Sequence, residues 1–209
     1  MTIYDISIPV TEDLAVWPGD TPFSFHLDMK IQNGEAVNVG AITLSVHTGT
    51  HADAPFHFSD SAASIEALSL EPYLGPALVV PAIRQDPIGP ETFVGLDLSR
   101  TPRVLIKTGA WTDHRVFPQA VPTLTHAAVT LLAERGAILV GVDVPSVDEI
   151  DSKTLPIHHA LNDAGIRILE SLNLSEVPAG EYELIALPQR IVGADGSPVR
   201  AILRQRTVE

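Results

Sequence analysis

Four side chains that can bind a divalent metal lie within one short stretch, HTGTHADAPFHF, which runs from residue 47 to residue 58. They are His47, His51, Asp53 and His57. Imidazole nitrogens and carboxylate oxygens are ligands of zinc and other divalent transition metals. The chain has no cysteine, so a metal site would have to use nitrogen and oxygen ligands. The alternative interpretation is a surface loop that happens to be rich in histidine.

The residues around these candidate ligands predict a strand that ends in a loop. Residues 41–46, AITLSV, alternate in polarity and include β-branched side chains, which is typical of a strand. Gly49 permits a tight turn between His47 and His51, and Pro55 breaks a helix. The helical zinc-protease motif also requires a glutamate directly after its first histidine, and this chain has a threonine there. We therefore expect the two histidines to converge from a loop.

A second set of candidate ligands lies in the back half of the chain. Residues 155–161 are predicted to form a short helix, which carries His158 and His159. Residues 166–170 alternate like a strand that ends at Glu170. On that strand the Glu170 carboxylate would point toward the core, which is costly unless the carboxylate is paired or bound to a metal. A histidine together with Glu170 is therefore a candidate second ligand set.

Length and charge narrow the classes of protein that this chain can belong to. It has 209 residues, of which 45% are hydrophobic and 19% charged, which fits a single domain over residues 1–209 with a substantial core. The formal charge of −13 argues against binding to nucleic acid or to an anionic membrane surface. There is no apolar run of membrane-spanning length and no basic signal-peptide front. We expect a soluble, cytoplasmic protein.

The remaining pattern predicts an α/β fold. Thr125 can cap a helix over residues 125–135, and residues 137–144 read as a strand that is buried on both faces. Residues 59–70 could form a lid or a short helix. Further strands are expected at residues 3–10, 23–31, 76–83, 103–108 and 184–188, with a hairpin over residues 190–204 around Asp195-Gly196.

Three isolated residues have two interpretations each. Trp17 lies in a turn cluster, where its indole could line a pocket for a flat ring or could cap the edge of the core. Asp143 and Asp148 flank Pro145 at a strand end, and turn or capping roles are favoured over a role in a site. Lys153 is assigned no role.

Several motifs resemble those of a known family. HTGTHADAPFHF is similar to the signature of the metal-dependent cyclase-like hydrolases. VWPGDTPF, VNVGAITLS, DSKTL and ILESL resemble, more specifically, the kynurenine formamidase (arylformamidase) branch of that family. The resemblance runs from about residue 3 to beyond residue 170, so it covers most of the chain. It implies a swivelling β/β/α single domain in the α/β class, with mixed sheets and few helices, and a homodimer.

The resemblance also implies roles for particular residues. Asp53 would bridge two metals, His57 would be the catalytic acid/base, and Trp17 would contact the substrate. His158 is preferred to its neighbour His159 as a ligand. The cofactor would be two Zn²⁺ per subunit, although other divalent metals fit the same ligand types. The positions that match the family's metal ligands are His47, His51, Asp53, His158 and Glu170.

The implied reaction is hydrolysis of N-formyl-L-kynurenine, a small-molecule substrate, to L-kynurenine and formate in tryptophan degradation. A hydroxide activated by two metals would attack the formyl group, and His57 would pass a proton to the aryl amine as it leaves. Another small amide or a cyclic imide could be hydrolysed by the same site. His57 could instead be a third ligand or a hydrogen-bond donor to a ligand. A metal-binding module without catalysis is the third alternative, and the presence of His57 argues against it.

Overall fold

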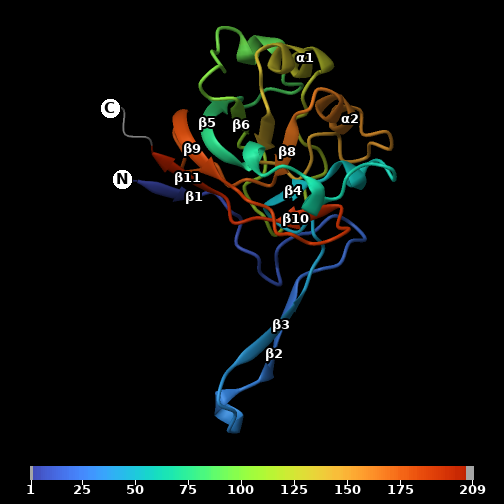
Figure 1. Ribbon diagram of the computed structural model, residues 1–209, viewed down its shortest axis with the longest axis vertical. Helices are drawn as coiled ribbons and strands as arrows, with labels where there is room; N and C mark the ends of the chain where they lie inside the picture. The colour runs from blue at the N-terminus through green and yellow to red at the C-terminus, as the bar shows by residue number, and fades with distance from the viewer. Residues whose placement is uncertain (1, 206–209) are drawn as a thin grey trace.

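The computed structural model describes residues 2–205, and its body is a curved sheet of nine strands (Figure 1). The central strands β5 to β8 run parallel, whereas the flanking pairs are antiparallel, so the sheet is mixed. The expected α/β class is confirmed. In spatial order the strands are β1 (Ile3–Asp5), β11 (Ile202–Gln205), β9 (Gly180–Ile185), β5 (Leu74–Pro81), β6 (Arg103–Lys107), β7 (Leu139–Val142), β8 (Arg167–Glu170), β4 (His51–Asp53) and β10 (Gly196–Pro198).

Two α-helices occur in the described part of the chain, α1 (His126–Glu134) and α2 (Pro156–Asp163), and both lie at the same end of the body (Figure 1). The Thr125 side chain accepts a hydrogen bond from the Ala128 amide at 3.1 Å, so the predicted helix cap is confirmed. Neither helix is long and apolar enough to span a bilayer. Short 3-10 turns are η1 (Ile31–Asn33), η2 (Pro55–His57), η3 (Ile65–Ala67), η4 (Glu71–Tyr73) and η5 (Pro90–Phe93).

The central sheet is buried on both faces, because alternate residues of each strand point to opposite sides. On β6, Val104 and Ile106 join the cluster that includes Val129 and Leu132 of α1. Leu105, between them in sequence, joins a second cluster on the other face. Two apolar layers therefore enclose the central strands, and these strands carry the loops that lead to the site.

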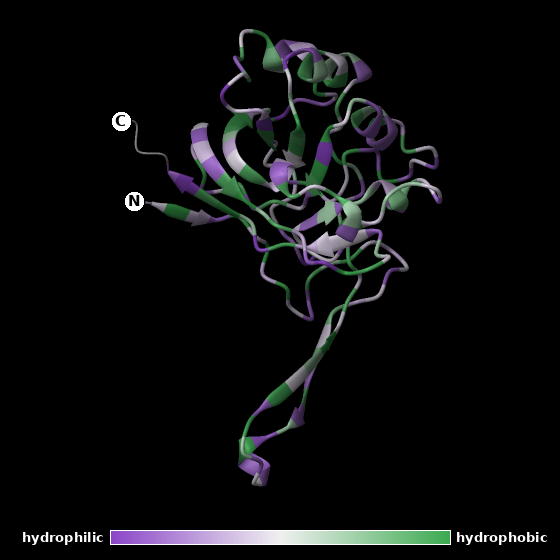
Figure 2. Ribbon diagram, in the orientation of Figure 1, coloured by the Kyte–Doolittle hydropathy of each residue, from purple (hydrophilic) through white to green (hydrophobic). Residues whose placement is uncertain are grey.

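A two-stranded arm projects from the body, away from the two helices (Figure 1). It consists of β2 (Ser24–Met29) and β3 (Val39–Thr43), which pair with each other outside the main sheet. Figure 2 shows hydrophobic residues along this arm. Phe25 and Ile42 pair across the two strands, with 49% and 60% of their surfaces exposed. The strand expected over residues 41–46 therefore ends earlier, at Thr43, and the chain turns before it reaches the histidines.

The hairpin predicted over residues 190–204 is wrong. Residues 190–195, its first arm, form no strand, and the two strands that follow, β10 and β11, do not pair with each other: β10 pairs with β4, whereas β11 pairs with β9 and β1. Asp195-Gly196 therefore does not form a hairpin turn: Asp195 directly precedes β10, which begins at Gly196 and lies next to β4. The strands that pair with β10 and β11 come from distant parts of the chain, so the local turn signal could not reveal them.

Candidate active site

Strand β4 presents His51 and Asp53 on one face of the sheet, because residues two apart on a strand point the same way. Ala52, between them, is fully buried in the core on the opposite face. In the antiparallel pairing with β8, His51 lies directly opposite Glu170. Cross-strand neighbours have side chains close together, so this register alone brings the early and late candidate ligands into contact.

His47 reaches the same place from the turn before β4. Gly49 has a φ of +66°, a left-handed conformation that glycine adopts without a steric penalty, and it reverses the chain between the two histidines. Gly196 of β10 lets the imidazole lie close, since a Cβ there would be only 2.9 Å from Cε1 of His47. The expectation that the two histidines do not lie on a helix is confirmed, but only His47 lies in a turn, because His51 begins strand β4.

The two oxygens of Asp53 face different imidazoles. Oδ1 lies 3.1 Å from Nδ1 of His47 and 3.3 Å from Nε2 of His51. Oδ2 lies 3.5 Å from Nε2 of His158. Glu170 completes the second group, with Oε1 at 3.5 Å from the same His158 nitrogen. The side chains therefore form two groups that could each hold an ion, with Asp53 common to both.

The far side of each imidazole is held by a second partner. His51 Nδ1 lies 2.8 Å from the Gly49 carbonyl oxygen, and His158 Nδ1 lies 2.7 Å from Asp148 Oδ2. A carbonyl oxygen can only accept, so Nδ1 of His51 carries the proton and Nε2 is left facing the carboxylates. Unless a cation lies between them, Nε2 must also be protonated. This arrangement is typical of imidazoles that bind a metal.

Because these polar side chains are buried, the cluster is unfavourable in free energy unless a cation compensates its carboxylates. Neither oxygen of Asp53 nor Nε2 of His51 has a hydrogen-bond partner of good geometry, although both residues are about 97% buried or more. Burial lowers the pKa of His51 and of His158, but the nearby carboxylates outweigh burial and raise each pKa to about 10. Burial raises the pKa of Asp53, yet the surrounding imidazoles hold it well below its ordinary value. The cluster thus has the donor atoms and charge that divalent ions require.

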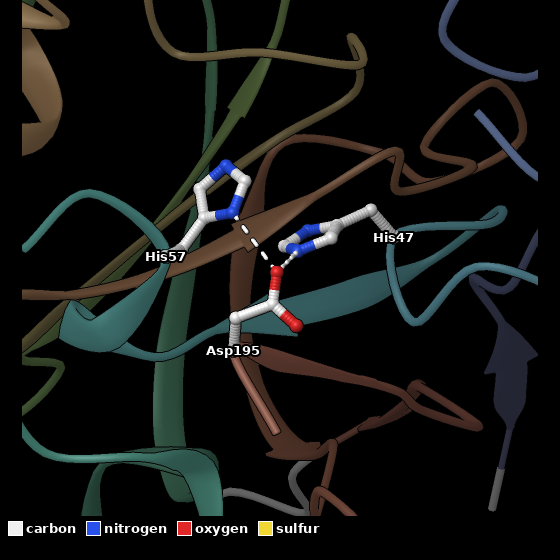
Figure 3. Close-up of side chains that lie close together, drawn as sticks. All are labelled: His47, His57 and Asp195. Atoms are coloured by element: carbon white, nitrogen blue, oxygen red, sulfur yellow. Dashed lines mark hydrogen bonds and ion pairs between the residues drawn. The ribbon is translucent and has the colours of Figure 1, made fainter. Parts of the chain in front are cut away.

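His57 lies beside this cluster and shares a carboxylate with His47 (Figure 3). Asp195 Oδ2 is 2.9 Å from Nε2 of His47 and 3.3 Å from Nδ1 of His57. The centroids of the two imidazole rings are 4.1 Å apart. The hydrogen bond to His47, the largest effect, holds the pKa of Asp195 well below its usual range. Sequence reasoning missed Asp195, because its one local signal, the Asp-Gly step, favours a hairpin turn.

A cavity of about 690 Å³ opens in front of these side chains. Its walls include His57 from the site and an aromatic group formed by Trp17, Trp111 and Phe117. The rings of Trp17 and Phe117 meet edge to face, with centroids 5.2 Å apart. The indole of Trp17 therefore lies on a pocket wall, as one of its two interpretations expected.

The structure separates the residues that the sequence left ambiguous. His158 is 97% buried in the cluster, whereas His159 is exposed, so the preference for His158 agrees with the geometry. Asp143 accepts hydrogen bonds from Thr108 and Gly109 and has the structural role that was favoured for it. Asp148 both caps α2, through the amides of residues 157 and 158, and orients the His158 ring.

The fold and this group of side chains together define the class of metal-dependent, cyclase-like hydrolases. A family model described as putative cyclase matches residues 4–149. A solved structure titled as a potential metal-dependent hydrolase with cyclase activity aligns with a TM-score of 0.80 and 27% identity, covering 98% of this chain and 99% of that chain. A predicted metal-dependent hydrolase from Bacillus stearothermophilus aligns with a TM-score of 0.78 and 28% identity, covering 97% of each chain.

The chain belongs to the putative cyclase family. Among curated relatives, the kynurenine formamidase of Geobacillus thermodenitrificans (strain NG80-2) is 47% identical over 201 residues, which are 96% of each chain. The kynurenine formamidase of Bacillus mycoides (strain KBAB4) is 44% identical over 200 residues, again 96% of each chain. The resemblance seen in the sequence motifs is confirmed. Isatin hydrolase A from Labrenzia aggregata, at 24% identity and a TM-score of 0.78, shares the fold and covers 97% of this chain and 93% of its own.

Proposed function

We propose that this protein hydrolyses N-formyl-L-kynurenine to L-kynurenine and formate. The observation that carries the proposal is the pair of ligand groups joined by Asp53, placed at the wall of a cavity of about 690 Å³. The aromatic walls formed by Trp17, Trp111 and Phe117 fit a substrate built on a benzene ring. The relatives at 44% and 47% identity carry the name of this activity.

The donor set fits two Zn²⁺ ions or other divalent metals of similar preference. One ion would be held by His47, His51 and Asp53, and the other by Asp53, His158 and Glu170. The fit is supported by the buried Asp53 oxygens that lack hydrogen-bond partners, since a cation would satisfy both. Bound divalent metals supply a Lewis acid for the formyl carbonyl and lower the pKa of a water to about 7.

The chain's own contribution to the chemistry is proton transfer and orientation. The leaving group is an aryl amine, which departs poorly unless its nitrogen is protonated as the C–N bond breaks. His57 is the imidazole at the cavity wall that lies outside both groups containing Asp53. Asp195 contacts its Nδ1 at 3.3 Å, which leaves Nε2 to exchange the proton with the substrate. In this proposal Asp195 positions the catalytic histidine.

The test is an assay of the zinc-loaded protein on N-formyl-L-kynurenine, followed by the absorbance of L-kynurenine and by formate release. We expect release of both products in equal amounts, and loss of activity after dialysis against a chelator with recovery on adding Zn²⁺. Isatin, a cyclic amide, serves as the comparison substrate. If the protein hydrolyses isatin and releases no L-kynurenine, the proposed substrate is wrong and the site acts on cyclic amides.

We also propose that the protein is a homodimer in which the β2–β3 arm binds a second copy. One face of the arm carries Phe25 and Leu27 opposite Ile42 and Gly40, and no other strand within residues 2–205 covers it. An isolated two-stranded hairpin is only marginally stable in water, so such an arm requires a partner surface. Its exposed apolar side chains argue for protein contact and not for solvent.

Light scattering after size-exclusion chromatography tests this. The wild type should run at twice its chain mass of 22.4 kDa. The double variant Phe25→Glu, Ile42→Glu should be a monomer. The matched control, His26→Glu with Thr43→Glu on the opposite face of the arm, should remain dimeric. A dimer that survives the first pair of changes would show that another surface forms the interface.

A further inference from the structure

We propose that Lys153 binds the α-carboxylate of an amino-acid substrate in the cavity, which makes it a specificity-determining residue. The inference rests on the proposed function for the identity of the substrate, and it adds which part of the substrate the chain recognises beyond the aromatic ring. The sequence alone assigned Lys153 no role, and the structure places it on the cavity wall.

Charge along the cavity wall points to this residue. Among the described residues that line the cavity, Lys153 is the one lysine or arginine. The carboxylates of Asp20, Glu170 and Asp195 line the same cavity. The whole chain has 13 lysines and arginines against 26 aspartates and glutamates, so a free carboxylate meets mostly negative charge. A substrate that carries its own carboxylate therefore has one cationic side chain to bind in this cavity.

The ammonium group of Lys153 has no partner within the described part of the protein. No hydrogen bond or ion pair joins it to another residue, including the Asp20 carboxylate on the same wall. Lys107 provides the contrast, because its ammonium donates to the carbonyl oxygens of Ser175 and Val177 and is used within the fold. Lys153 thus keeps its donors available for a ligand.

Hydrogen bonds connect both ends of the loop that carries Lys153 to the candidate ligands. At its start, the Val147 amide donates to Glu170 Oε1 at 2.8 Å. At its end, the carboxylate of Asp148 accepts from the Ile157 amide at 2.9 Å and contacts His158. Between these points, Ser152 Oγ accepts from the Leu155 amide at 3.1 Å. The two ends of the loop that carries Lys153 are therefore held by side chains of the site.

The substrate class follows from how these walls are arranged. The ligand groups and His57 take the formamide, the aromatic walls take the ring, and Lys153 takes a carboxylate carried on a side chain of that ring. This selects an aryl formamide whose ring bears an amino-acid substituent over simple formanilides. A charge-assisted hydrogen bond of this kind commonly changes binding by about tenfold to hundredfold.

The experiment compares two substrates on matched variants. Lys153→Met removes the ammonium and keeps most of the stem, Lys153→Arg restores a cation, and Arg100→Met removes an exposed positive charge that does not line the cavity. We expect Lys153→Met to lower kcat/KM on N-formyl-L-kynurenine by about tenfold to hundredfold, chiefly through KM, and on its α-carboxamide by less than about threefold. Lys153→Arg should recover most of the loss. Equal losses on both substrates, or no loss on the first, would overturn the inference.

A binding measurement separates this inference from the proposed function. L-kynurenine carries the same amino-acid group, so calorimetric titration into the zinc-loaded protein needs no turnover. We expect its Kd to rise about tenfold or more in Lys153→Met and to stay unchanged in Arg100→Met. If the wild type hydrolyses no formamide, the proposed function fails, yet this titration still decides the role of Lys153. Equal binding by both proteins, or none by the wild type, refutes it.

Discussion

Replacing His57 with alanine separates its proposed role as an acid/base from a role as a metal ligand. The side chain is 32% exposed and its hydrogen bond to Asp195 is long, at 3.3 Å. Truncation should therefore change the free energy of unfolding by less than about 1 kcal/mol. Neither group that contains Asp53 loses a ligand atom, so the metal content should be preserved.

The expected loss is in turnover. A positioned proton-transfer group contributes about 10²–10⁴ in rate, which corresponds to about 2.7–5.5 kcal/mol of transition-state stabilisation. We expect His57→Ala to lose kcat by that factor on N-formyl-L-kynurenine with a smaller change in KM. The assay is steady-state kinetics together with elemental analysis of the same dialysed sample. His159→Ala is the matched control, because His159 is exposed and its ring contacts Phe58 at 5.2 Å.

A third group of side chains gives His57 an alternative role as a metal ligand, and the same experiment tests it. His47, His57 and Asp195 form a third group whose ligand atoms lie close enough to hold an ion. If His57→Ala loses metal in proportion to its activity, that group binds an ion and His57 is a ligand. If it keeps both the metal and full activity, the aryl amine receives its proton from another group.

Three further predictions address the ligands, the pocket and the fold. Asp53→Ala should lose both metals on dialysis, because both groups need its oxygens; elemental analysis that still finds two ions would exclude the shared ligand. Trp17→Ala should raise KM several-fold with little change in kcat, through lost contact with the ring, and unchanged kinetics would limit Trp17 to packing against Phe117. Thr125→Ala should lower the free energy of unfolding by about 1 kcal/mol in urea titrations, and an unchanged midpoint would show that the α1 cap contributes nothing.

Several features of this protein could be predicted from the sequence because they depend on residues that are close together in the chain. The turn at Gly49 is determined over a few residues and the candidate ligands around it lie close in sequence, so this group could be predicted, although the strand over His51–Asp53 was expected to be a loop. The same holds for Thr125 and its helix, where the cap and the helix lie within one turn. The unfavourable inward position of Glu170 was also a local signal, because it follows from strand alternation alone.

Tertiary structure decided which of these local pieces meet. The pairing of β4 with β8 sets Glu170 opposite His51, and the pairing of β4 with β10 brings Asp195 to His47, 148 positions earlier in the chain. The arm could not be predicted from the sequence either. Its two strands pair as an ordinary hairpin does, and Phe25 is exposed only because the pair lies outside the main sheet.

The sequence by itself determined the kinds of donor atom, the turn at Gly49 between the first two histidines, and the α/β character of the fold. Only the tertiary structure decided that Asp195 joins His47 and His57, that Asp148 orients His158, and that Lys153 faces the cavity. The physical reason is range: propensity and alternation act over a few residues, whereas strand order is chosen by burial of surfaces that belong to distant segments.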